Sequence, residues 1–222
     1  MAERAVDNGP DAAMLQEGAA ALGASLSDEA ARRLLWLREE LLRWNARVNL
    51  TAITDPREVL EKHLLDSLAI LPEVRGASTL LDVGAGAGFP GIPLKIALPE
   101  LRLTLVDSVG KKVAFMKSAL AHLGLGQARA VQVRAEGWPE REGLEPAEVV
   151  VSRAFMDVAR WVPLGAKYAA PGARVLAMMG HPPELPRLEE AGRAAGLRLA
   201  SLRRYRLPWS GSERAVATFE TR

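Results

Sequence analysis

The chain has 222 residues, 49% of them hydrophobic and 25% charged, which is enough for one large domain with a continuous buried core. It contains no cysteine, which excludes disulfides, thiolate metal sites, iron–sulfur clusters and every mechanism with a cysteine nucleophile. The net charge of +2, from 29 basic and 27 acidic residues, neither requires nor excludes a nucleic-acid partner.

The sequence shows no sign of export, membrane insertion or metal binding. Its first residues, MAERAVDNGPDAAML, lack the basic-then-apolar order of a signal peptide, and no run approaches the roughly eighteen apolar residues of a membrane span. His63, His122 and His181 are far apart and do not have the spacing of metal ligands. We therefore expect a cytoplasmic protein with no metal and no membrane partner. We also expect a monomer, because no long exposed apolar stripe is evident.

Residues 11–74 have the pattern of helices. In the first long segment the apolar residues recur every three or four positions, at Leu34, Leu37, Leu41, Trp44 and Val48. Ser27 is the expected N-cap of that helix. A second start signal is Asp55 as a cap before Pro56. The buried face of this second helix is predicted to consist of Leu60, Leu64, Leu68 and Leu71.

From residue 78 onward, short apolar runs alternate with helix-like segments. The predicted strands are 79–83, 101–107, 130–135, 148–153 and 173–179. The predicted helices are 90–98, 110–124, a short stretch near Trp138, 156–170 and 183–196. This alternation is typical of a parallel sheet covered on both faces. The tail, residues 198–221, is predicted to form two strands joined by a turn that contains glycine, with antiparallel pairing at that end of the sheet.

These patterns predict an α/β, Rossmann-like architecture. We expect a mostly parallel, seven-stranded sheet with an antiparallel terminal strand. Residues 1–75 would form a helical N-terminal cap and residues 76–222 the Rossmann-like domain, the two together making one compact unit.

The stretch LLDVGAGAGFPGIPL, residues 80–94, places a glycine-rich turn after the first predicted strand. Such a turn lets the backbone approach a ligand closely. Two motifs fit it. Gly86, Gly88 and Gly91 match the dinucleotide fingerprint G-x-G-x-x-G. Read from Asp82, the same stretch is D-x-G-x-G-x-G, and this pattern resembles the first motif of class I S-adenosylmethionine-dependent methyltransferases.

The local chemistry favours the second motif. A pyrophosphate needs free amides at the start of the following helix, and Pro90 and Pro93 remove two of them. S-adenosylmethionine carries an amine, a carboxylate and a sulfonium, and an acid such as Asp82 with nearby amides suits that amino-acid group. Candidate cofactor residues in the loop are therefore Asp82, Gly84, Gly86 and Gly88. The alternatives are a dinucleotide site and a turn that serves only packing.

Further cofactor candidates follow the second and third strands. Asp107 ends the second strand, where its carboxylate can accept both ribose hydroxyls; its alternative is a cap of the helix that opens just after Ser108. Ser108 belongs to the same candidate set. Ala135 and Glu136 follow the third strand, where a loop can bind an adenine edge, and the alternative for Glu136 is a solvated surface acid.

The fourth strand ends in Ser152-Arg153-Ala154-Phe155, without the Pro-Pro-aromatic motif of enzymes that methylate exocyclic amines. Carbon-5 pyrimidine methylation is excluded because there is no cysteine. An acceptor that is nucleophilic when neutral, such as a guanine N7, needs no base, and alignment alone can supply about 7–11 kcal/mol of a barrier. Arg153, a charge that closes an apolar strand, is the expected ligand contact; its alternative is a structural ion pair.

The residues together resemble one family, the bacterial small-subunit ribosomal RNA guanine-N7 methyltransferases first named as glucose-inhibited division protein B. The resemblance covers about residues 34–214. It is carried by WN at 44–45, NLT at 49–51, KHLLDS at 62–67, DVGAGAGFPGIPL at 82–94, LVDSVGKK at 105–112 and VSRAF at 151–155. Two positions depart from the family: Met179 stands where a lysine is common, and the chain ends in ATFETR instead of a lysine-rich tail.

The resemblance implies a function and a set of contacts. The function is methylation of one guanine N7 in small-subunit ribosomal RNA, free or in the small ribosomal subunit. The cofactor contacts would be Gly84, Phe89, Ala135, Glu136 and Arg153, with Asp107 on the ribose. The helix with KHLLDS would place His63, Asp66 and Ser67 near the guanine, although a core histidine is the alternative for His63.

A basic, aromatic run near the C-terminus is typical of RNA binding, although such a run is also typical of a solvated face. The candidate RNA contacts are Lys111, Lys112, Arg203, Arg204, Arg206 and Arg214, with Tyr205 and Trp209 between the arginines. Three rival functions stay open: a nicotinamide-dependent oxidoreductase, a methyltransferase with another acceptor, and a non-catalytic RNA-binding assembly factor. The first lacks a recognisable Tyr-x-x-x-Lys pair.

Overall fold

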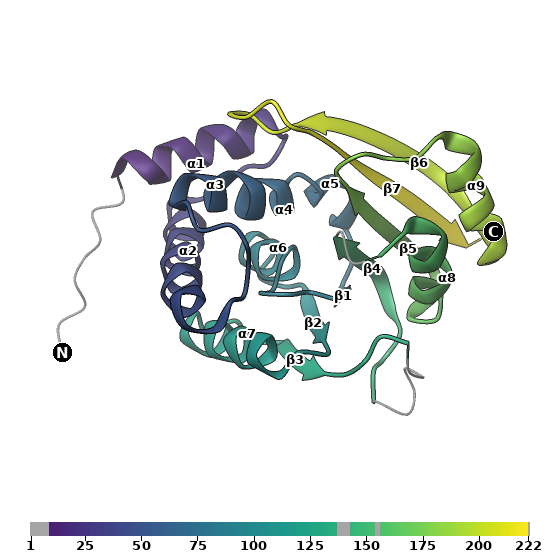
Figure 1. Cartoon of the computed structure of the whole chain (residues 1–222), viewed down its shortest axis with the longest axis horizontal. Helices are drawn as coiled ribbons and strands as arrows, with labels where there is room; N and C mark the ends of the chain where they lie inside the picture. The colour runs from purple at the N-terminus through teal and green to yellow at the C-terminus, as the bar shows by residue number, and fades with distance from the viewer. Residues whose placement is uncertain (1–8, 137–142, 154–155, 222) are drawn as a thin grey trace.

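The structure, a computed structural model, describes residues 9–136, 143–153 and 156–221. Within these residues a seven-stranded sheet has the order β3-β2-β1-β4-β5-β7-β6 (Figure 1). The strands are β1 (Thr79–Val83), β2 (Arg102–Asp107), β3 (Ala128–Gln132), β4 (Ala147–Arg153), β5 (Ala169–Met179), β6 (Leu197–Arg206) and β7 (Glu213–Thr221). Strands β1 to β5 pair in parallel, and β7 is antiparallel to both β5 and β6. The predicted mostly parallel sheet with an antiparallel last strand is confirmed.

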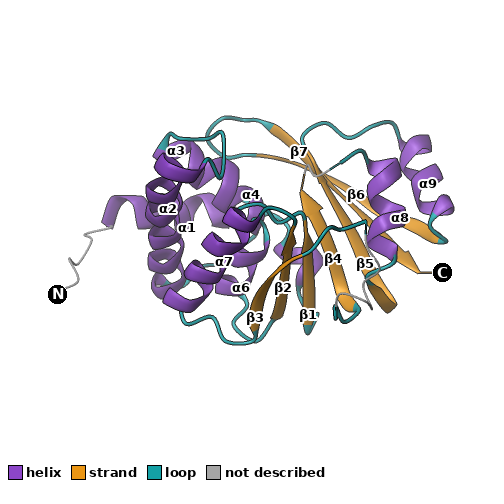
Figure 2. Cartoon of the chain, turned by 60° about the horizontal axis from the view of Figure 1, so that its bottom comes forward, coloured by secondary structure: helices purple, strands orange, loops and turns teal. Residues whose placement is uncertain are grey.

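Helices cover both faces of the sheet (Figure 2). The described helices are α1 (Gly9–Ala21), α2 (Asp28–Val48), α3 (Pro56–Val59), the π-helix η1 (Leu60–Leu65), α4 (Asp66–Leu68), α5 (Leu71–Val74), α6 (Gly91–Ala97), α7 (Gly110–His122), α8 (Val158–Ala166) and α9 (Leu185–Ala194). Helices α6 and α7 share one apolar cluster with the N-terminal helices, and α8 and α9 form a second cluster on the opposite face. None of the described helices has the length and apolar character to cross a membrane.

The N-terminal helices begin where the sequence predicts. Ser27 caps α2 by accepting a hydrogen bond from the amide of Ala30, and Asp55 caps α3 by accepting from the amide of Glu58. The predicted buried residues Leu34, Leu37, Leu41, Leu60, Leu64, Leu68 and Leu71 are all buried. Their side chains pack in the same cluster as residues of β1, β2 and β4, so the helical cap and the sheet share one core.

One helix differs from expectation, because residues 60–65 form a π-helix where a regular helix is predicted. The amide of Asp66 donates to the carbonyls of Glu61 and His63 and passes over that of Lys62. The Lys62 carbonyl instead accepts a hydrogen bond from Arg153 on β4. The wider turn therefore releases one backbone acceptor to a side chain 91 residues away.

Some predicted boundaries are wrong. Strand β3 is Ala128–Gln132 instead of 130–135, because its partner β2 ends at Asp107, opposite Gln132. The helix predicted over 156–170 ends at Ala166, because Ala169 already pairs with Ala147 in the sheet. The predicted helical stretch near Trp138, and Ala154 and Phe155 of the VSRAF motif, lie outside the described residues.

Candidate active site

The glycine-rich turn joins β1 to α6 at the carboxyl edge of the sheet. Gly84, Gly86 and Gly88 have φ of 70°, 61° and 87°, and residues with a Cβ atom rarely adopt such positive φ angles. A Cβ on Gly86 would meet no atom within 4 Å, so open space lies in front of this position. The turn therefore combines a conformation that requires glycine with room for a ligand.

Most amides of the turn are already used inside the protein. The amides of Gly84 and Ala85 donate to the Val106 carbonyl, and those of Gly88 and Phe89 donate to the Ala85 carbonyl. The amide of Gly86 donates to a carboxylate oxygen of Asp107, described below. In the described chain, the Ala87 amide is the one from 84–89 left without such a bond.

The start of α6 is equally closed to an anion. The Gly91 amide donates to Asp82 at 2.8 Å, the Ile92 amide donates to the Gly88 carbonyl, and Pro93 has no amide hydrogen. A dinucleotide pyrophosphate binds through free amides at this end of a helix. Because these amides already donate hydrogen bonds within the protein and the prolines have none to offer, the turn is a poor site for a dinucleotide. It suits a ligand that needs space and few hydrogen-bond donors.

Asp82 lies behind this turn and is completely buried. Its Oδ2 accepts from the Gly91 amide, and its Oδ1 has no hydrogen-bond partner among the described residues. Burial raises the pKa of Asp82 to about 7, even though the Gly91 hydrogen bond acts in the opposite direction. Asp82 thus ties the start of α6 to β1, and its predicted contact with a cofactor stays a prediction.

Asp107 sits at the end of β2 and braces the same turn. Its Oδ2 accepts from the Gly86 amide and its Oδ1 from the Val109 amide, each at 2.9 Å. The side chain is not the N-cap of α7, since Val109 occupies that position. Each carboxylate oxygen keeps a further lone pair, so Asp107 can still accept from hydroxyl groups. Ser108 beside it is exposed.

The loop after β3 closes this side of the site. Ala135 is buried, and its carbonyl accepts a hydrogen bond from the hydroxyl of Tyr168 at 2.6 Å. Glu136 next to it is exposed, as is Lys111 at the start of α7, whereas Lys112 is half-buried. Among the described residues no group of three or more His, Asp or Glu side chains is arranged to hold a metal ion.

Arg153 at the end of β4 is held by three partners from the π-helix region. One terminal nitrogen donates to the Lys62 carbonyl at 2.9 Å and to Asp66 Oδ2 at 3.2 Å, and the other meets His63 Nδ1 at 3.0 Å. The structural ion pair weighed as an alternative is therefore present, as Arg153–Asp66. A guanidinium has five N–H donors, so two stay available for a ligand after these bonds.

Three neighbouring side chains, those of Thr51, Phe89 and Arg153, hold the ring of His63. It stacks on the ring of Phe89 with centroids 4.8 Å apart, and Arg153 lies 5.6 Å from the same Phe89 centroid. Because a guanidinium nitrogen can only donate, His63 Nδ1 must accept, so the proton of the neutral ring is on Nε2 and faces Thr51 Oγ1 at 2.9 Å. Burial, and then the charge of Arg153, lower the pKa of His63 to about 3. His63 is therefore a neutral platform with both nitrogens engaged.

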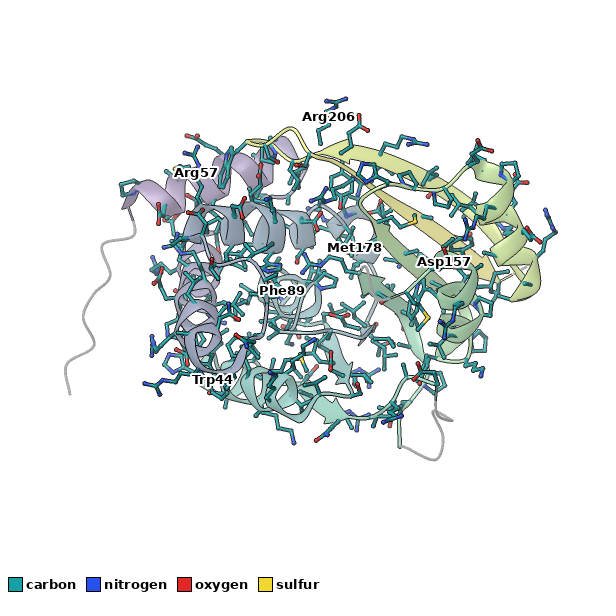
Figure 3. The ribbon with its side chains drawn as sticks, viewed as in Figure 1. Trp44, Arg57, Phe89, Asp157, Met178 and Arg206 are labelled. Atoms are coloured by element: carbon teal, nitrogen blue, oxygen red, sulfur yellow. The ribbon has the colours of Figure 1, made fainter. Side chains whose placement is uncertain are left out.

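A pocket of about 400 Å³ opens next to this cluster, and we call it the basic pocket. Its lining consists of Ile53, Lys62, His63, Asp66, Arg153, Met178, Met179, Gly180, His181, Tyr205 and Arg214. The pocket thus joins the π-helix, the ends of β4 and β5, and the β6–β7 hairpin. In Figure 3, Phe89 and Met178 lie near the middle of the molecule and Arg206 lies at its margin. Ser67 is buried, and its hydroxyl donates a hydrogen bond to the His63 carbonyl, which stabilises the backbone of the π-helix.

Three carboxylates of the helical cap hold the β6–β7 hairpin over this pocket. In order, Arg203 binds Glu73 at 2.6 and 2.8 Å, Tyr205 donates to Asp66 at 2.9 Å, and the amides of Trp209 and Ser210 both donate to Glu61 at 2.6 Å. The segment 203–210 of the hairpin therefore runs antiparallel to residues 61–73. Burial and the Asp66 charge raise the pKa of the Tyr205 hydroxyl, which keeps it a donor.

The hairpin contacts include residues that sequence reasoning placed elsewhere or missed. Arg203, predicted to bind RNA, spends its donors on Glu73 and the Ala69 carbonyl. Tyr205 and Trp209 were predicted only as stacking rings, and Glu61 was not predicted at all. The spacing of Glu61 and Asp66 on one helix is a weak signal, because their partners lie 139 to 149 residues away. Arg204 and Arg206 are exposed, and Arg214 is half-buried near Asp66.

The family model and the relatives that match this chain carry the same description. The family model described as GidB, rRNA small subunit methyltransferase G, matches residues 31–199. A ribosomal RNA small subunit methyltransferase G from Myxococcus xanthus is 56% identical over 214 residues, which cover 96% of this chain and 99% of the relative. The protein of that name from an Anaeromyxobacter species is 51% identical and covers 95% of this chain and 97% of the relative.

Solved structures agree at the level of fold. Magnesium protoporphyrin IX methyltransferase from Synechocystis with bound SAH superposes with a TM-score of 0.60 at 10% identity, over 83% of this chain and 93% of that chain. A SAM-dependent methyltransferase from Aquifex aeolicus gives 0.55 at 18% identity, over 76% and 94%. The sheet is thus that of Rossmann-like methyltransferases. By the matched family model and these full-length relatives, the chain belongs to the rRNA small subunit methyltransferase G (GidB) family.

Proposed function

We propose that this chain transfers a methyl group from S-adenosylmethionine to the N7 of a guanine in small-subunit ribosomal RNA. The observation that carries the proposal is the hydrogen-bond pattern of the turn after β1. Its amides and those of α6 are consumed internally, while open space faces Gly86 and lone pairs remain on Asp107. These features fit an amino-acid nucleoside better than a pyrophosphate. The names and high identity of the relatives supply the acceptor class.

Residues on one side of Phe89 would bind the cofactor, and residues on the other side would bind the guanine. Gly84, Gly86, Asp107 and the loop at Ala135–Glu136 would hold the cofactor, with Asp107 accepting from its ribose hydroxyls. When bound, S-adenosylmethionine supplies an electrophilic methyl group on sulfur. The basic pocket would receive the guanine, with the His63 ring and its Phe89 stack as the wall between the two sides.

The chemistry needs alignment more than proton transfer. Attack by the guanine N7 lone pair forms the N–C bond while the S–C bond breaks, and no proton leaves the base. His63 cannot act as a base, because its Nδ1 already accepts from Arg153. The guanine gains positive charge as it is methylated, and the carboxylate of Asp66 lines the pocket where that charge would develop. The absence of a free acid–base pair among the described side chains of this pocket is consistent with such a reaction.

The test is a labelling experiment with defined acceptors. The chain is incubated with methyl-labelled S-adenosylmethionine and either bare ribosomal RNA or assembled small subunits, and the labelled base is mapped. We expect one labelled guanine, with the label on N7. Label on another base, or on another class of molecule, would refute the acceptor. Tight binding of S-adenosylhomocysteine without any transfer would instead support a non-catalytic RNA-binding factor.

A further inference from the structure

The β6–β7 hairpin carries a second hollow beside the basic pocket, and we call it the arginine hollow. It measures about 220 Å³ and is lined by Pro182, Arg204, Tyr205, Arg206, Glu213 and Arg214. Tyr205 and Arg214 line both hollows, so the two adjoin at these residues. Three guanidinium groups and a single carboxylate surround the arginine hollow, which gives it a local excess of positive charge.

The arginines of this hairpin are not equivalent. Arg203 is bound to Glu73 through two contacts and holds the hairpin in place. Arg204, the next residue, is exposed and forms no ion pair within the described chain, because the residue opposite it on β7 is Ala215. Among the described residues, no carboxylate forms an ion pair with its charge. Neighbouring residues on one strand thus serve different purposes, one structural and one open to a ligand.

Arg206 can also turn to a ligand. Its ion pair with Glu213 has a nitrogen-to-oxygen distance of 2.6 Å, but both side chains are more than half exposed, at 71% and 60%. Exposed pairs of this kind contribute little to stability, so an anion can displace the carboxylate. Arg214 donates to the Glu213 carbonyl and lies 3.8 Å from Asp66, which places its charge on the border between the two hollows.

We propose that the arginine hollow binds a backbone phosphate directly next to the guanine held in the basic pocket, with Arg204 as its principal contact. This inference rests on the proposed function. Arginine presents fixed donors that match a phosphate, and a base splayed out of an RNA strand must be accompanied by its own backbone. The carboxylates at 61, 66 and 73 fix the distance between the two hollows, because they fix the hairpin that forms a wall of each.

The test measures methylation of small ribosomal subunits by Arg204→Ala at several salt concentrations. We expect KM to rise about tenfold at moderate salt while kcat changes less than about twofold. The slope of log affinity against log salt should become shallower by about 0.7, as expected for one lost phosphate contact on single-stranded RNA. Binding of S-adenosylhomocysteine should be unchanged, which shows that the fold and the cofactor side are intact.

Arg198→Ala is the matched control. Arg198 lies on the same strand and is exposed like Arg204, but it lies at the far end of the hairpin, where it pairs with Glu220 on β7 at 2.6 Å. This variant should behave like the wild type. Arg204→Lys should restore most of the salt slope, because it keeps the charge, and less of the affinity, because it loses the planar donors.

The phosphate itself can be located with subunits reconstituted from sparsely ethylated RNA. Ethylation of one phosphate beside the modified guanine should raise the KM of the wild type about tenfold and should not raise the KM of Arg204→Ala further. Equal effects of Arg198→Ala and Arg204→Ala, a loss confined to kcat, or an unchanged ethylation pattern would overturn the phosphate site alone. A wild type that methylates no guanine would overturn the proposed function and this site together.

Discussion

The two sides of the site are built in different ways. The turn after β1 is made of backbone from one short segment. The hydrogen bonds donated by its amides, and its φ angles, involve only residues 82–109. The basic pocket is made of side chains from distant segments, and hydrogen bonds that span up to 139 residues join Asp66, Arg153 and Tyr205. A change in the turn should therefore act locally on cofactor binding. A change in the pocket should act through the network that holds it together.

The sharpest way to test this contrast is Gly86→Ala against Gly124→Ala. Both glycines have positive φ, 61° and 58°, and a Cβ on either would meet no atom within 4 Å. Each substitution should cost about 1–2 kcal/mol of unfolding free energy through backbone strain. Only Gly86→Ala places a methyl group in the proposed cofactor space, and we expect its affinity for S-adenosylhomocysteine to fall by about a hundredfold. Calorimetry and denaturant unfolding measure the two effects, and equal affinities for the two variants would contradict the local role of the turn.

The second test breaks the network at its centre. Arg153→Ala removes the donor shared by His63, Asp66 and the Lys62 carbonyl, and we expect methylation to fall tenfold or more while the fold persists. Arg187→Ala, which removes an exposed ion pair with Asp157, is the control. Transfer assays and circular dichroism give the readout. Unchanged activity in Arg153→Ala would assign this residue to the scaffold.

The third test concerns the pH dependence of stability. The folded-state pKa of His63, about 3, lies below its ordinary value of 6.5, so the unfolded chain binds a proton that the native chain refuses. The unfolding free energy should therefore fall as pH drops from 6.5 toward 3, by at most about 1.4 kcal/mol per pH unit. His63→Asn, which keeps an oxygen to accept from Arg153, should lack this contribution.

Asp82 has the opposite sign and must be separated. Its pKa is raised from 3.8 to about 7, so its contribution to stability is lost as pH rises through that range. Asp82 is present in both the wild type and His63→Asn, and the difference between their denaturation curves cancels it. Parallel pH dependences would show that His63 is solvated and protonated in the native state. The rate of methyl transfer should show no inflection near pH 6.5 from His63.

The geometry of the glycine turn could be predicted from the sequence because its determinants are local. The spacing of Gly84, Gly86 and Gly88 after an apolar strand predicts a turn with positive φ, and Asp107 at the next strand end is brought to it by parallel pairing. The caps at Ser27 and Asp55 are likewise short-range signals.

The pocket side was only partly predictable. Arg153 and the KHLLDS segment were singled out, but nothing in their spacing shows that Lys62 gives its carbonyl to Arg153 through a π-helix. The roles of Arg203 and Tyr205 depend on which face of β6 meets the helical cap. That face is decided by β7, which enters between β5 and β6, and a sequence pattern alone does not fix such an insertion.

The clamped hairpin has a consequence for how the molecule is made. Residues 61–73 leave the ribosome long before 203–210, so the carboxylates of Glu61, Asp66 and Glu73 lack their hairpin partners until the last strands have been made. A growing chain that stops short of residue 197 already contains the glycine turn and Asp107 but lacks Tyr205 and Arg214, which line both hollows. We expect such a chain to bind S-adenosylmethionine before it can bind RNA, so the two binding activities would form one after the other during synthesis.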